Sequence, residues 1–167
     1  MKVIKILTYI LITILFVIAL LAIWYRAEFS MGIASAYELN DPTLENRVLI
    51  ATQESKYKDA VVDAVVKQLK DLPVYIRVID VSGLDDVDPA LWNAIVILHT
   101  WEIGAPEEHS KKFVDRAPAA KLVVVTTSGS GEQKLSNVDG ISSASKLEGT
   151  QWTANMIFNR VQILLNN

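Results

Sequence analysis

A run of 20 residues near the start of the chain, Ile6 to Tyr25, contains no charged side chain. As a helix rising ~1.5 Å per residue, such a run measures about 30 Å, the thickness of the hydrocarbon core of a bilayer. A helix satisfies its own backbone polar groups and can therefore cross lipid as a single segment. Trp24 and Tyr25 stand where an aromatic belt meets the headgroups. The run predicts an N-terminal transmembrane anchor over 1–26.

Charges on either side of the run favour one orientation. Lys2 and Lys5 precede it, whereas the positive charge of Arg26 after it is balanced by Glu28. Because lysine and arginine concentrate on the cytoplasmic side of membrane helices, we expect a single-pass protein of an inner or plasma membrane. Its N-terminus would be cytoplasmic and the rest of the chain extracytoplasmic. One alternative is a cleaved secretory signal, since the small residues at 34–36 resemble a cleavage site, and another is a buried helix of a soluble protein.

Composition after the run excludes several classes of protein. Of the 16 basic residues 13 follow position 26, as do all 19 acidic ones, which gives this part a formal charge of −6. An acidic domain without a basic stripe is a poor candidate for binding nucleic acid. The chain has no cysteine, which excludes disulfides, thiolate catalysis and cysteine-ligated metal centres. No nucleophile, base and acid stand in a known catalytic pattern, so the sequence leaves open whether the protein is an enzyme.

Beyond residue 26 the chain divides into a weakly patterned segment, 27–46, and a regular one, 47–167. The first is expected to be a juxtamembrane linker, and the second a domain. In the second, short aliphatic runs alternate with amphipathic stretches, which predicts strands alternating with helices. The expected strands are 48–51, 74–81, 94–98, 122–125 and 140–144, and the expected helices are 58–72, 106–116 and 153–165.

Short aliphatic strands separated by helices indicate an α/β fold, a doubly wound parallel sheet of five strands with helices on both faces. In such sheets, ligands bind beyond the carboxyl ends of the strands, where the strand order reverses. The segments expected to form a site are therefore 52–58, 99–105 and 126–134.

Two of these segments resemble a known family. The stretch from Thr100 to Glu108, followed by Phe113, is similar to the Thr-Trp and glycine stretch after the third strand of flavodoxins. The stretch from Ser128 to Gln133 is similar to their glycine-containing loop after the fourth strand. The resemblance to the flavodoxin-like family implies the strand order 2-1-3-4-5 and the cofactor FMN.

The resemblance also implies which residues would hold FMN. The loop after the first strand would bind the phosphate at a helix N-terminus, where free N–H groups meet an anion. Trp101 would stack on the flavin ring. The cofactor-binding residues expected on this basis are Thr52, Ser55, Lys56, Tyr57, Thr100, Trp101, Gly104, Ser128, Gly129 and Gly131.

The phosphate loop of this chain departs from the family pattern. Glu54 and Tyr57 stand where flavodoxins have threonine, and Ser55 replaces a glycine. A carboxylate repels a phosphate by about 1 kcal/mol in water and by more when water is excluded. Two functions follow: a tethered binding or assembly module with a protein partner and lost or weakened cofactor binding, or an FMN-binding electron-transfer protein at the membrane surface.

Overall fold

The computed structural model describes the backbone of residues 2–29 and 31–166, and the side chains of residues 2–24 and 31–166. The chain forms two compact units, Met1–Met31 and Gly32–Asn167. The boundary falls 15 residues before position 47, where the regular strand pattern of the sequence begins.

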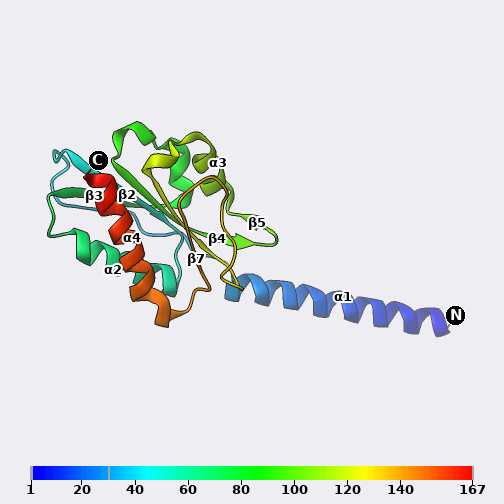
Figure 1. The fold of residues 1–167 in the computed structure, drawn as a ribbon. Helices are drawn as coiled ribbons and strands as arrows, with labels where there is room; N and C mark the ends of the chain where they lie inside the picture. The colour runs from blue at the N-terminus through cyan, green and yellow to red at the C-terminus, as the bar shows by residue number, and fades with distance from the viewer. Residues whose placement is uncertain (1, 30, 167) are drawn as a thin grey trace. The chain divides into compact units, whose positions relative to one another are not determined.

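The first unit contains one helix, α1 (Lys2–Phe29), drawn in blue in Figure 1. Its segment Lys2–Trp24 is long and apolar enough to cross a bilayer, and all of its described side chains are exposed. Length and composition of this kind fit a membrane anchor and a secretory signal alike. The side chain of Tyr25, expected in an aromatic belt, lies outside the described residues, as do those of Arg26 and Glu28.

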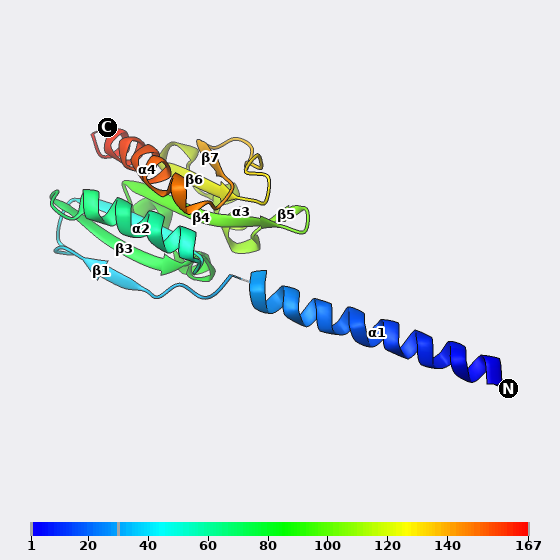
Figure 2. The same cartoon turned by 90° about the horizontal axis from the view of Figure 1, so that it is seen from below.

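The second unit is built on a mixed sheet with helices on both faces (Figures 1 and 2). Its seven strands are β1 (Tyr37–Leu39), β2 (Asn46–Thr52), β3 (Val74–Asp80), β4 (Ala94–Glu102), β5 (Ala105–Pro106), β6 (Leu122–Thr127) and β7 (Gly140–Ser143). They stand in the order β1-β3-β2-β4-β6-β7, and β5 pairs with β4. The strands β3, β2, β4, β6 and β7 are parallel to one another, in the order 2-1-3-4-5 when these five are numbered along the chain.

The predicted number of strands, five, was wrong, because two short antiparallel strands are added to the sheet. β1 pairs with the outer edge of β3, and β5 folds back on the end of β4. β1 lies inside the expected linker 27–46, so residues 32–46 belong to the sheet unit and not to a free connection. A strand of three residues is too short to show a period in the sequence. Its position is set by the strand it pairs with, and local residue preferences do not predict it.

The helices cover the two faces of the sheet unequally. Helices α2 (Lys56–Leu69) and α4 (Thr150–Leu165) pack together on one face. Helix α3 (Glu108–Arg116) packs with the 3₁₀ turn η1 (Val81–Asp86) on the other. The remaining 3₁₀ turns are η2 (Pro89–Leu91), η3 (Ala119–Lys121) and η4 (Leu147–Gly149).

The central strands are apolar throughout because both of their faces are buried. In β2, Val48 and Ile50 face the core under α2 and α4, whereas Leu49 and Ala51 face the core under α3. Successive side chains of a strand point to opposite faces, so a continuous apolar run fills both cores. Because the five central strands are parallel, their carboxyl ends lie at one edge, which we call the carboxyl edge of the sheet.

Candidate functional site

The loop that follows β2 is joined to the end of β4 at the carboxyl edge by buried and partly buried hydrogen bonds. The side-chain oxygen of Gln53 accepts the backbone N–H of Thr100 at 2.9 Å. The ammonium group of Lys58 donates to the same oxygen at 3.2 Å and to the hydroxyl of Thr100. Two of the segments expected to form a site, 52–58 and 99–105, are thus in contact, and Gln53 and Lys58 are residues of this cluster that the expected cofactor-binding set does not include.

Lys58 is almost completely buried, with 1% of its surface exposed. Burial lowers the pKa of its ammonium group to about 8, against the opposing influence of Glu102, Asp59 and Glu107. Its hydrogen bonds within the described part of the chain go to neutral oxygens. A buried cation of this kind lies beneath the loops and is closed off from solvent, so it stabilises an internal network in preference to an external anion.

A second buried residue, His99, continues this network from β4 to β6. The imidazole of His99 lies 3.2 Å from the carbonyl of Thr100 and 2.9 Å from the hydroxyl of Thr126. A carbonyl only accepts, so Nδ1 carries the proton and Nε2 accepts from the threonine. Burial lowers the pKa of His99 to about 4, which leaves the ring neutral at physiological pH. His99 is thus a fully buried, hydrogen-bonded residue.

The loop after β6 closes onto β7. The backbone N–H of Ser128 donates to the carbonyl of Ser143 at 3.1 Å, and its hydroxyl accepts the N–H of Gly131 at 3.0 Å. Gly131 has a φ of 72°, and a Cβ there would lie 2.9 Å from the backbone nitrogen of Ala144. Gly129, by contrast, is exposed with open space around it.

Tyr57 is turned into the structure and is buried. Its hydroxyl lies 2.6 Å from that of Ser143 and 2.8 Å from that of Thr153. The side chain is 3% exposed and links the start of α2 to β7 and α4. Its neighbour Lys56 is exposed at the first position of α2.

In the loop expected to bind a phosphate, several backbone N–H groups donate to oxygens of the chain. The N–H of Glu54 donates to the carbonyl of Gly32 at 3.0 Å, and the N–H of Gly32 donates back at 3.2 Å. The Ser55 hydroxyl caps α2 by accepting the N–H of Lys58 at 3.1 Å. The N–H of Asp59 donates to the Ser55 carbonyl at 2.8 Å. Thr52 is buried, with its hydroxyl on the carbonyl of the next residue.

The loop after β4 is a hairpin that extends beyond the sheet. Trp101 is half-buried against the core under α3 and pairs with Pro106 of β5. The turn consists of Ile103 and Gly104, both with positive φ, at 48° and 79°. Ile103 is 93% exposed at the tip. Trp101 and Gly104 thus stand apart from the buried network, whereas Thr100 belongs to it.

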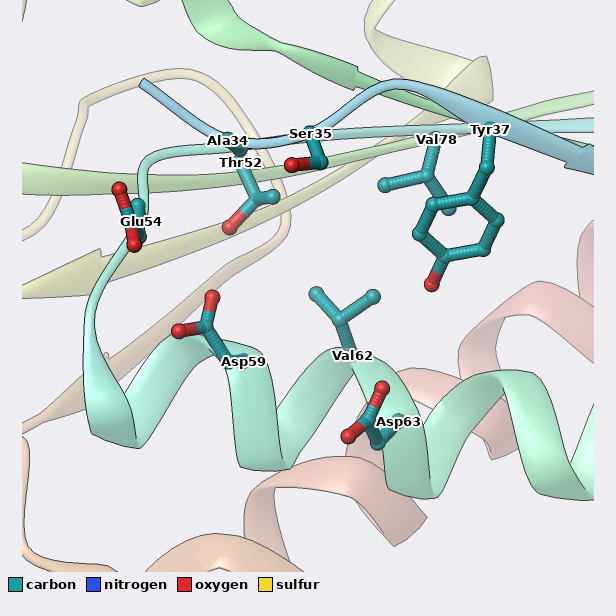
Figure 3. A pocket seen from close by; sticks show the side chains of 9 residues that line it. All are labelled: Ala34, Ser35, Tyr37, Thr52, Glu54, Asp59, Val62, Asp63 and Val78. Carbon is teal, nitrogen blue, oxygen red and sulfur yellow. The ribbon is translucent and has the colours of Figure 1, made fainter. Parts of the chain in front are cut away.

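An acidic pocket of about 220 Å³ lies between α2 and the segment that leads into β1 (Figure 3). Asp59 and Asp63 rise into it from α2, and the hydroxyl of Tyr37 points toward them. Burial raises the pKa of Asp59, with Glu54 and Asp63 adding to the effect. Burial and the two aspartates likewise raise the pKa of Tyr37. No set of three or more histidine, cysteine, aspartate or glutamate residues is placed to hold a metal ion within the described residues.

Comparisons with known proteins give the fold. No family model and no curated protein matches the chain. A flavodiiron core from Synechocystis sp. PCC6803 is similar with a TM-score of 0.50 at 8% identity, over 74% of this chain and 36% of that one. A flavodoxin from the domain Archaea (TM-score 0.48, 12% identity) covers 71% of this chain and 98% of its own. Oxidised flavodoxin 2 from Bacillus cereus is similar with a TM-score of 0.46 at 12% identity, over 70% of this chain and 98% of that one. The sheet unit has a flavodoxin-like fold, and at these identities the likeness concerns the fold alone.

Proposed function

We propose that this protein is a membrane-tethered, flavodoxin-like binding module that works without FMN. The observation that carries the proposal is the two-way backbone pairing of Glu54 with Gly32, at 3.0 and 3.2 Å. In the family that this chain resembles, that position belongs to the phosphate loop. Here, Gly32, at the start of the sheet unit, pairs with the backbone of Glu54 in this loop. The exposed carboxylate of Glu54 also replaces the threonine hydroxyl of the family pattern.

The residues of this loop fit a phosphate poorly for two reasons. The N–H of Glu54 already donates to the carbonyl of Gly32 and that of Lys58 to the hydroxyl of Ser55, so a phosphate using these two donors would first have to displace those bonds. The carboxylate of Glu54 would also repel it, by about 1 kcal/mol in water and by more in a desolvated site. The buried Lys58 does not offset this, since its ammonium group is held by Gln53 and Thr100.

The tether is the second part of the proposal. Helix α1 would remain uncleaved and cross the bilayer once, with the domain on the extracytoplasmic side and the cytoplasmic Lys2 and Lys5 at the other. A reporter fused after Asn167 that is active only outside the cytoplasm would support this orientation. A reporter active only in the cytoplasm would overturn it.

The alternative is an FMN-binding electron-transfer protein, and Trp101 is the observation in its favour. This residue lies at the end of β4, next to the hairpin, where the resemblance places a ring-stacking aromatic. A bound flavin would need that ring together with the backbone of the hairpin, and FMN would supply one-electron chemistry when bound.

Flavin binding separates the two functions. The full-length protein is purified in detergent, its absorbance is recorded, and its melting temperature is measured with and without FMN. A ligand that binds only the folded state stabilises it, by about 2.7 kcal/mol at a ligand concentration 100 times the Kd. The melting temperature rises as a result. We expect no flavin absorbance and no shift. A shift that is lost in Trp101→Ala would establish the alternative and overturn the cofactor-free module.

A further inference from the structure

Large apolar side chains are exposed at the carboxyl edge of the sheet. Ile33 follows Gly32, whose backbone pairs with Glu54 just after β2. Ile103 forms the tip of the hairpin after β4, and Leu147 lies in η4 after β7. Trp152, in the first turn of α4, is 58% exposed. We call these four residues, Ile33, Ile103, Leu147 and Trp152, the apolar rim.

Ile103 holds its exposed position under local strain. Its φ of 48° is in the left-handed region, which a β-branched residue rarely adopts. An asparagine before Gly104 would form the favoured two-residue turn without this strain. The chain therefore combines an unfavourable backbone conformation with an almost fully exposed apolar side chain, and both are explained if the tip enters an apolar surrounding.

The domain begins at the same edge. Gly32 is fixed there by its pairing with Glu54, and the N–H of Ala34 donates to the carboxylate of Asp80 at 2.8 Å. Only residues 25–31 separate Gly32 from Trp24, the end of the apolar segment. Whatever its course, a chain of this length reaches at most about 28 Å. If α1 crosses a bilayer, Gly32 at the carboxyl edge is thus held within about 28 Å of the end of the apolar segment.

We propose that the apolar rim docks into the interfacial layer of the bilayer that anchors the protein. The inference rests on the membrane tether of the proposed function and adds the partner of the carboxyl edge. Tryptophan and aliphatic side chains are favoured at the headgroup level, where an apolar body is buried and polar groups stay wet. A domain held in this way lies on the membrane and presents the loops after β2, β4 and β7 to it.

The charges near the rim indicate which lipids are involved. Around the carboxyl edge, the exposed charged residues in and beside the segments that follow β2, β4, β6 and β7 include Glu54, Lys56, Glu102, Glu132, Lys134, Lys146 and Glu148. They include no excess of basic groups, so attraction to anionic headgroups is not the driving force. Docking then depends on apolar insertion and takes place on zwitterionic lipid.

The absence of cysteine allows a direct test with single-cysteine variants of the full-length protein. Ile103→Cys and Trp152→Cys are labelled with an environment-sensitive fluorophore and reconstituted into phosphatidylcholine vesicles that carry a nitroxide-labelled lipid. Leu91→Cys is the matched control, since Leu91 is 61% exposed in η2, before the start of β4. Phe16→Cys, in the middle of α1, reports on the anchor itself.

We expect the nitroxide lipid to quench the probes at positions 103 and 152 several-fold more than the probe at position 91. If the probe at position 16 is quenched and those at 103 and 152 match the control, the docked rim is refuted while the anchor stands. An unquenched probe at position 16 refutes the anchor, and the rim proposal with it. A probe at 103 that is shielded in native membranes but not in pure lipid would point to a protein partner and overturn the lipid assignment.

Discussion

The side-chain oxygen of Gln53 accepts the backbone N–H of Thr100 at 2.9 Å and so joins the ends of β2 and β4. The same oxygen accepts from the buried ammonium group of Lys58. This glutamine lies in the loop where the resemblance predicts a phosphate site, yet it turns inward and ties the loop to the sheet. The carboxyl edge is thereby fixed by its own side chains, and this arrangement has measurable consequences for stability.

Replacing Lys58 by methionine should remove a dependence of stability on pH. Burial lowers the pKa of Lys58 to about 8 from 10.5, so below pH 8 both states are protonated and the fold bears the full penalty. Above pH 8 the folded state releases its proton first, and the free energy of unfolding rises, by about 2 kcal/mol near pH 9.5. We expect this rise in the full-length protein in detergent and its absence in Lys58→Met, measured by denaturant unfolding.

Lys56→Met is the matched control, because Lys56 is exposed two positions earlier in the same helix. It should keep the rise. Comparison stays below pH 10, where the raised pKa values of Tyr37 and Tyr75 begin to act in the opposite direction. A rise of equal size in Lys58→Met would show that the lysine is hydrated in the folded state.

His99 should make the fold sensitive to mild acid. Burial lowers its pKa to about 4 from 6.5, so above pH 6.5 the ring is neutral in both states and carries no penalty. As the pH falls from 6.5 to 4, the unfolded chain takes up the proton and the free energy of unfolding drops by about 3 kcal/mol. His99→Gln should lose less stability over this range than the unmodified protein. His109→Gln, at an exposed residue 2.9 Å from Asp85, serves as control, and equal acid sensitivity of both variants would contradict the prediction.

Gly131→Ala should destabilise the loop between β6 and β7. The residue has a φ of 72°, and the added Cβ would lie 2.9 Å from the nitrogen of Ala144. A non-glycine residue in this region costs of the order of 1–3 kcal/mol. Gly129→Ala, with open space around it, should change stability by less than about 0.5 kcal/mol. Thermal melts of both variants decide the point, and two equal melting temperatures would show that the loop adapts.

Ile103→Asn should stabilise the isolated fold in detergent. The left-handed conformation costs an ordinary residue about 1–2 kcal/mol, and asparagine before Gly104 adopts it readily. We therefore expect a gain of about 1 kcal/mol in the free energy of unfolding. Leu91→Asn, an exposed apolar residue without positive φ, should change stability by less than about 0.5 kcal/mol. A loss of stability in Ile103→Asn would mean that the isoleucine packs within the fold.

The buried lysine shows what the sequence signals without revealing its role. Lys58 lies in register with Val61, Val62 and Val65, the apolar stripe of the helix, so its burial could be predicted from spacing alone. Its partners could not, since Gln53 lies in the loop after β2 and Thr100 in the strand β4. Periodicity tells which face of a helix is covered, but it does not tell which polar atom from elsewhere in the chain meets a residue on that face.

The loop after β4 shows the opposite case. The aliphatic run 94–98 predicts a strand, yet β4 continues to Glu102 and turns back into β5. Pro106, expected to open the following helix, is part of that hairpin, and α3 begins at Glu108 after a cap by Glu107. Within residues 99–102, His99 and Thr100 are polar but remain buried and paired with β6, whereas Trp101 and Glu102 extend beyond β6 and pair with β5.

Local patterning of this chain determined the apolar N-terminal helix, the buried parallel strands, the order in which strands and helices alternate, and the convergence of the loops at one edge. These features follow from runs and periods within one segment, because burial selects apolar side chains segment by segment. The tertiary structure alone decided the pairing of Gly32 with Glu54, the added edge strand at Tyr37–Leu39 and the inward turn of Gln53. Each of these depends on a hydrogen-bond partner distant in the chain, and backbone donors and acceptors are the same at every residue, so no local pattern specifies which of them will meet.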